Sequence, residues 1–148
     1  MDQSREHYRQ LESMYQAAPL NDFYSPVMQV AKGTAEISID ITEKFFHAGQ
    51  AVHGSVYFKM LDDAAFFAAN SLELEYFVLT TSFTTHLTKP ISNGKMTALG
   101  KVVSETPRQF MAESIVYNAK GEEIGRGNGI FFRSKNKLMD IEGYRSRD

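Results

Sequence analysis

The chain has 148 residues, of which 43% are hydrophobic and 23% charged, and its formal net charge is −2. This length and composition predict one globular domain over residues 1–148, and the small net charge gives no electrostatic basis for binding nucleic acid or an anionic membrane. The complete lack of cysteine excludes disulfides, thiolate nucleophiles and cysteine-based metal sites.

The sequence shows no recognisable signal for targeting, membrane insertion or metal binding. The first sixteen residues are polar and charged, unlike a signal peptide, and no run of about 18 apolar residues predicts a membrane span. The histidines show no metal-ligand spacing, and they are His7, His47, His53 and His86. We therefore expect a cytoplasmic protein without a metal site.

The N-terminal part predicts a helix followed by a strand. Residues 4–18 repeat apolar side chains at helical spacing, so residues 1–24 form a helical extension that ends near Pro19. Residues 27–42 alternate apolar and polar side chains with a period of two, which predicts a strand. Gly33 within this run marks a bulge or a turn.

The middle of the chain predicts one long helix, from Gly54 to about Leu74. No proline interrupts this segment, and its apolar residues cover nearly all faces at helical spacing. A helix that is apolar on most faces is buried rather than lying on a surface. It nevertheless carries two adjacent carboxylates, Asp62 and Asp63.

The second half predicts four strands, over residues 76–88, 95–105, 110–117 and 124–133. The connectors between the last three are short and hairpin-like, so the sheet is expected to be antiparallel. The polar tail over residues 134–148 is expected to be frayed.

These elements predict an α+β fold. A curved antiparallel sheet of about five strands would wrap around the long central helix, with an extra N-terminal helix outside. Such a sheet leaves an open edge and part of the helix uncovered, which favours a dimer.

A short motif carries a family resemblance. His53-Gly54-Ser55 precedes the central helix, and Asp62 follows His53 by nine positions. Together with the order of elements over roughly residues 27–133, this pattern resembles the hotdog-fold acyl-CoA thioesterases. It is closest to the branch of the phenylacetate-pathway thioesterases, in which the motif reads HGG and an aspartate follows on the helix.

The chemistry of thioester hydrolysis fits these residues. A carboxylate can act as general base or as nucleophile, and a backbone amide at a helix N-terminus can stabilise the oxyanion. Eight residues of helix separate the Cα atoms of Gly54 and Asp62 by roughly 12 Å. The resemblance implies that two subunits close this gap, one giving the amide and the other the acid. It also selects Asp62 over Asp63, whose side chain points about 100° away.

Further site residues follow from the same resemblance. His47 stands where this branch often has an asparagine that holds the thioester carbonyl or the water, so it either binds that oxygen or acts as an acid or base. Thr80 is expected to position the attacking water, with Thr81 or Ser82 as alternatives, and Thr81 is also expected to contact the substrate. His53 and Ser55 are expected near the substrate. His53 is favoured as a residue that braces the loop rather than as a direct participant in the chemistry, and Ser55 is also explained as a cap of the helix.

A glycine-rich segment near the C-terminus has two interpretations. Gly125, Gly127 and Gly129 share one face of a strand. They either allow close packing of a neighbouring element or form a slot for the pantetheine arm of CoA.

The resemblance therefore implies an acyl-CoA thioesterase that works as a homodimer or a tetramer of dimers and needs no cofactor. One alternative is a non-catalytic module that binds acyl-CoA. Another is a hotdog hydratase or dehydratase that uses His47 and Asp62. The loop before the helix lacks the prolines of the dehydratase pattern, which places that alternative last.

Overall fold

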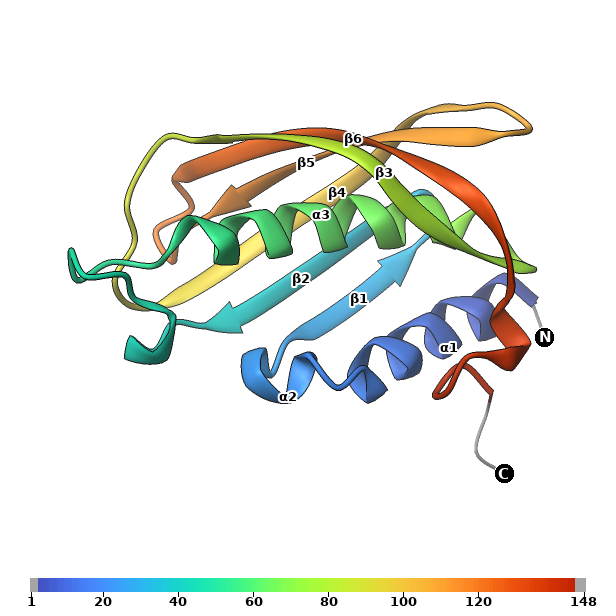
Figure 1. The fold of residues 1–148 in the computed structure, drawn as a ribbon, viewed down its shortest axis with the longest axis horizontal. Coiled ribbons are helices and arrows are strands. Elements are labelled where there is room, and N and C mark those ends of the chain that lie inside the picture. Colours follow the sequence, from blue (N-terminus) through green and yellow to red (C-terminus); the bar gives the residue numbers. More distant parts are fainter. Residues whose placement is uncertain (1–2, 146–148) are drawn as a thin grey trace.

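Six antiparallel strands form one curved sheet, and the long helix α3 (Gly54–Ser71) lies against its inner face (Figure 1). This computed structural model describes residues 3–145. The strand order is β1-β2-β4-β5-β6-β3, and every neighbouring pair is antiparallel. The remaining bounds are α1 (Gln3–Ala17), α2 (Asn21–Tyr24), β1 (Val27–Ala31), β2 (Thr34–Asp40), β3 (Tyr76–Leu87), β4 (Lys95–Glu105), β5 (Gln109–Tyr117), β6 (Glu123–Lys137) and the 3-10 turns η1 (Glu43–Phe45) and η2 (Leu138–Asp140).

The sheet has six strands because residues 27–42 form a hairpin. The single strand predicted there is wrong, since the chain reverses between β1 and β2. Gly33 lies in this turn with φ of +70°, a conformation that glycine adopts at little cost. The turn interpretation of Gly33 is therefore the correct one.

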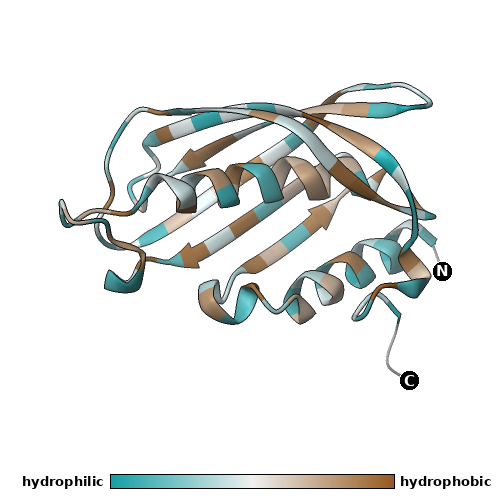
Figure 2. Ribbon diagram, in the orientation of Figure 1, coloured by the Kyte–Doolittle hydropathy of each residue, from teal (hydrophilic) through white to brown (hydrophobic). Residues whose placement is uncertain are grey.

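The core lies between the inner face of the sheet and α3. The strands alternate in hydropathy along their length (Figure 2), and β2 buries Ala35, Ile37 and Ile39 while its other face is largely exposed. The helix approaches β4 closely at Gly100, where an added Cβ would lie 2.2 Å from the backbone oxygen of Ala64. This contact fixes the middle of α3 over the sheet.

The two edges of the sheet differ in their cover. The free edge of β1 is occupied by α1, because the Val30 N–H donates to Glu12 (2.9 Å) and Arg9 donates to the Val30 carbonyl (3.0 Å). At the opposite edge, β3 pairs with β6 alone among the strands of the described residues. That edge therefore keeps unpaired backbone groups that can bind another strand.

The C-terminal segment packs against α1, so the frayed tail that was expected from residue 134 on is wrong for residues 134–145. Residues 146–148 of that expected tail lie outside the described residues. Strand β6 runs on to Lys137, and both Leu138 and Tyr144 are buried. His7 on α1 donates from Nε2 to the Asn70 carbonyl (2.8 Å), so its Nδ1 accepts the hydroxyl proton of Tyr144 (2.6 Å). Both ends of the described chain thus meet at one end of the molecule (Figure 1).

Candidate active site

Asp62 lies midway along α3 and faces β3. Its Oδ1 accepts a hydrogen bond of 2.9 Å from the Thr80 hydroxyl. Burial raises the pKa of Asp62 to about 6, against the effect of the Thr80 hydrogen bond, and the neighbouring charge of Asp63 adds to the rise. The result is a desolvated carboxylate that changes protonation state just below neutral pH.

Strand β3 is held so that Thr80 meets this carboxylate. Buried Asn70, near the end of α3, accepts a hydrogen bond from the Val78 N–H (2.9 Å) and thereby ties the start of β3 to the helix. The strand then bulges between Thr80 and Ser82. The extra residue, Thr81, is exposed and donates to a carbonyl of β6 at 3.1 Å rather than to Asp62.

The adjacent carboxylate, Asp63, is held on a different side of α3. Its Oδ2 lies 2.6 Å from the Lys59 ammonium and accepts a 2.6 Å hydrogen bond from the Tyr15 hydroxyl of α1. Neither Lys59 nor Tyr15 was among the site residues predicted from the sequence. The four-residue spacing of Lys59 and Asp63 was a usable signal for the ion pair, whereas nothing in the local pattern indicates Tyr15.

The start of α3 is capped by its own loop. His53 is the N-cap residue, and its Nδ1 accepts a 3.0 Å hydrogen bond from the Ser55 N–H and lies 2.8 Å from the Ser55 hydroxyl. Gly54 is the first helical residue, so its N–H has no acceptor within the helix. An amide of this kind at the positive end of the helix dipole is suited to bind an anion.

His47 lies in a tight loop beside this amide. The Gly49 N–H donates to His47 Nδ1 (2.9 Å), so the neutral ring carries its proton on Nε2 and can donate it to a ligand. His47 and Gly54 line one pocket of about 320 Å³. Its other lining residues are Ala51, Val52, Tyr57, Leu87, Thr88, Lys89 and Pro90.

Within one chain, the predicted site therefore divides into two halves. The pocket brings His47 and Gly54 together, and the hydrogen bond brings Asp62 and Thr80 together. Neither Asp62 nor Thr80 lines the pocket that contains Gly54.

The glycines of β6 face an aromatic ring. An added Cβ at Gly127 or at Gly129 would lie 2.5 Å from the ring of Phe83. At Gly125 it would lie 3.0 Å from the His86 carbonyl oxygen of β3. These positions thus serve the close packing of β3 on β6.

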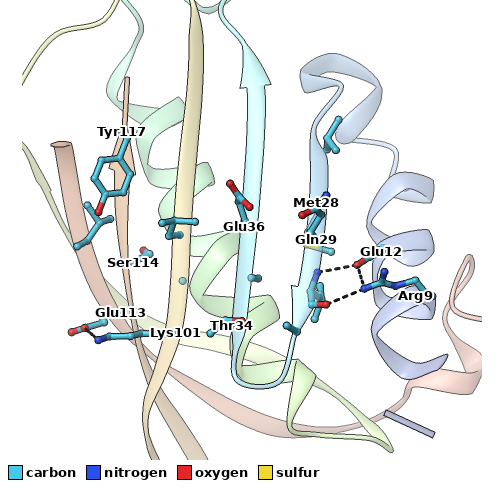
Figure 3. A pocket seen from close by; sticks show the side chains of 17 residues that line it. Arg9, Glu12, Met28, Gln29, Thr34, Glu36, Lys101, Glu113, Ser114 and Tyr117 are labelled. Atoms are coloured by element: carbon cyan, nitrogen blue, oxygen red, sulfur yellow. Dashed lines mark hydrogen bonds and ion pairs between the residues drawn. The ribbon is translucent and has the colours of Figure 1, made fainter. Parts of the chain in front are cut away.

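A larger hollow of about 900 Å³ lies on the outer face of the sheet, between β1, β2, β4, β5 and α1 (Figure 3). Its lining includes an ion pair of Lys101 with Glu113 (3.4 Å) and the contacts of Arg9 and Glu12 described above. None of the site residues predicted from the sequence lines it.

The described residues show neither a metal site nor a membrane-spanning helix. Within residues 3–145, no group of three or more histidine, aspartate or glutamate side chains is arranged to hold a metal ion. In the same residues, no helix combines the length and the apolar character needed to cross a membrane.

The curved sheet around one long helix is the hotdog fold, and the comparisons with known proteins specify the family. The sequence model of the Thioesterase superfamily matches residues 49–124, which include Gly54, Asp62 and Thr80 but begin two positions after His47. This chain belongs to the thioesterase superfamily.

Two relatives carry names that agree with hydrolysis. A protein of Sulfurisphaera tokodaii named "Putative esterase" is 26% identical over 103 residues, which cover 70% of this chain and 77% of that protein. A second protein with that description, from Saccharolobus solfataricus, is 24% identical over 115 residues, covering 76% of this chain and 77% of its own length.

Solved structures share the fold at low sequence identity. The E. coli PaaI protein from the phenylacetic acid degradation operon has a TM-score of 0.83 at 17% identity, over 92% of this chain and 99% of that one. A thioesterase family protein from Silicibacter pomeroyi has a TM-score of 0.77 at 20% identity, over 85% and 96% of the two chains.

Proposed function

We propose that this protein hydrolyses an acyl-CoA thioester to a free acid and CoA, at a site shared by two copies of the chain. Membership of the thioesterase superfamily supports thioester hydrolysis. The acyl-CoA substrate, the roles of the residues and the cytoplasmic setting are part of the proposal.

Asp62 is the proposed catalytic carboxylate, and its environment is the observation that carries the proposal. A carboxylate with a pKa of about 6 is largely ionised at pH 7 and is a stronger base than an exposed aspartate. In this proposal the Thr80 hydroxyl, which donates to Asp62, also orients the attacking water; their hydrogen bond supports this role. Asp62 either takes a proton from this water or attacks the thioester carbonyl itself.

The N-terminus of α3 is the proposed oxyanion site. The Gly54 amide donates to the carbonyl oxygen as it becomes negative, and His47 Nε2 adds a second donor in the same pocket. His53 and Ser55 hold the loop that presents these donors.

The second copy is needed because one chain separates the acid from the oxyanion donors. The open edge of β3 offers a surface for pairing, and three large apolar side chains near it are exposed. Phe58 on α3 is 42% exposed, and Leu79 and Leu87 on β3 are 47% and 50% exposed. Pairing along β3 would bury such side chains, in a homodimer or within a tetramer of dimers.

The direct test is thiol release from short, medium, long and aromatic acyl-CoAs by the full-length protein. Asp62→Asn is expected to lose most of the activity, because asparagine can neither accept the proton nor attack. Asp40→Asn is the matched control, since the Asp40 side chain is 83% exposed in a surface ion pair. Full activity of the Asp62→Asn protein over the whole panel would contradict the proposal.

The same panel separates the alternatives. Tight binding of an acyl-CoA in calorimetry without thiol release would favour the binding module. Hydration of an enoyl-CoA that depends on both His47 and Asp62 would favour the hydratase.

A further inference from the structure

A buried charge cluster lies directly beside the proposed catalytic carboxylate. Lys59 and Asp63, one turn apart on α3, form an ion pair of 2.6 Å, with their side chains only 10% and 19% exposed. The Tyr15 hydroxyl donates to the same Asp63 oxygen at 2.6 Å and lies 3.4 Å from the Lys59 ammonium. The cluster thus joins the central helix to α1.

The ammonium of Lys59 is enclosed by aromatic rings of the N-terminal extension. Its Nζ lies 5.2 Å from the centroid of the Tyr15 ring and 4.9 Å from that of Tyr24, which belongs to α2. Both distances suit a cation–π interaction. A lysine, which is ordinarily flexible, is therefore held in one place next to two aspartates.

This arrangement has an electrostatic consequence for Asp62. A second negative charge on the adjacent residue would oppose ionisation of Asp62 in these partly buried surroundings, whereas a fixed positive charge favours it. In the described residues, the charged groups that act on Asp62 are Asp63 and Lys59, both on α3, while β3 contributes the Thr80 hydroxyl. Tyr15 on α1 faces the same cluster; burial raises the pKa of its hydroxyl, and the charge of Asp62 helps to raise it.

The pKa of Asp62 reflects its burial, the Thr80 hydrogen bond and the two charges of the ion pair. Burial gives the main rise, and the Thr80 hydrogen bond lowers the pKa. Asp63 raises it and Lys59 lowers it, so the two members of the ion pair act in opposite directions.

We propose that Lys59 is a positioning residue of the reaction: held by Tyr15 and Tyr24, it neutralises Asp63 and so keeps Asp62 available as the water-activating carboxylate. This inference rests on the proposed function of Asp62. It also gives the N-terminal extension a part in the activity, because Tyr15 and Tyr24 come from residues 1–24.

The test compares the pH dependence of kcat/KM in variants of the ion pair. On the acidic side of the profile, kcat/KM falls with an apparent pKa. Lys59→Met is expected to raise this apparent pKa by about one pH unit, and Asp63→Asn is expected to lower it. The double variant is expected to have an apparent pKa close to that of wild type. Lys59→Arg keeps the positive charge, so its apparent pKa is also expected to match wild type. Lys95→Met removes the lysine of an exposed ion pair with Asp40 and is the matched control, with no expected shift.

A titration of the ¹³C-labelled carboxyl of Asp62, assigned by the loss of its signal in Asp62→Asn, gives a readout that is independent of activity. The same opposite shifts are expected in it. Shifts in one direction for both single variants, or no shift in either, would overturn the inference and leave the role of Asp62 standing. Full activity of Asp62→Asn would instead remove the proposed function, while the titration would still report whether the ion pair controls the charge of Asp62.

Discussion

Replacing Asp62 by asparagine should make the folded protein more stable at neutral pH while removing activity. Burial raises the pKa of Asp62 from 3.8 to about 6, so the folded state binds this proton more tightly than the unfolded state does. The stability gained from the protonated group is complete below about pH 4 and is lost as the pH rises through 6. Above pH 6 the folded wild-type protein carries an ionised carboxylate in partly buried surroundings.

The size of the effect follows from the difference between the two pKa values. About two pH units correspond to about 3 kcal/mol, and partial contact of Asp62 with solvent reduces the expectation to about 1–3 kcal/mol. Asparagine is neutral at every pH and keeps an oxygen that can accept the Thr80 hydrogen bond of 2.9 Å. For a chain of this length, each kcal/mol added to the free energy of unfolding raises the melting temperature by about 2–4 °C.

Thermal unfolding followed by circular dichroism at pH 7.5 and pH 4.0 measures this difference. The Asp62→Asn protein should melt several degrees above wild type at pH 7.5, and the two should nearly coincide at pH 4.0. The exposed control Asp40→Asn should show no such pH-dependent gap. A variant that is no more stable than wild type at pH 7.5, or a gap that persists at pH 4.0, would refute the account of Asp62 as a desolvated carboxylate.

Three further outcomes are expected. In wild type, kcat/KM should fall with an apparent pKa near 6 as the pH is lowered, because protonated Asp62 is no base; a profile flat from pH 5 to pH 8 would contradict this. Gly54→Pro should lower kcat by about a hundredfold with the helix intact, because proline lacks the N–H but is tolerated at a first helical position. His53 before it has φ −63° and ψ 144°, which proline accepts, and Gly54→Ala, which keeps the N–H, is the control and should retain most activity. Gly100→Ala should lower the free energy of unfolding by about 3 kcal/mol or more in urea titrations, because its Cβ would meet the backbone of Ala64 at 2.2 Å; wild-type stability would show that α3 can move away.

Local patterns in the sequence were enough for most of the fold. The strand predicted between two turn-like connectors at residues 95–105 coincides with β4, and the apolar run of the central helix predicted the start of α3 at Gly54. The hairpin was missed because the apolar alternation continues across Gly33, so that its only signal was one glycine.

The contacts of the C-terminal segment could not be read from local patterns. Leu138 and Tyr144 stand in a polar stretch, and Tyr144 bonds to His7, which is 137 positions away. The same reason applies to Tyr15, whose contact with Asp63 spans 48 positions. Such pairs become visible only when the fold brings α1 against α3 and the end of the chain.

For the candidate site, the sequence motif singled out the residues, whereas their hydrogen bonds and ion pairs were visible only in the structure. The spacing from His53 singled out Asp62, and the structure adds the Thr80 hydrogen bond and the ion pair that engages Asp63 instead. The assignment of catalytic roles to these residues remains a prediction.

Mixed dimers can decide whether two chains build each active site together. Asp62→Asn and Gly54→Pro chains, co-expressed with different tags and purified through both, form heteromers in which each chain carries one defect. If the acid of one chain works with the amide of the other, one site of the two is intact, and about half of the wild-type activity per dimer should return. If both groups act within a single chain, the mixed dimer should stay as inactive as either parent, which would contradict the account.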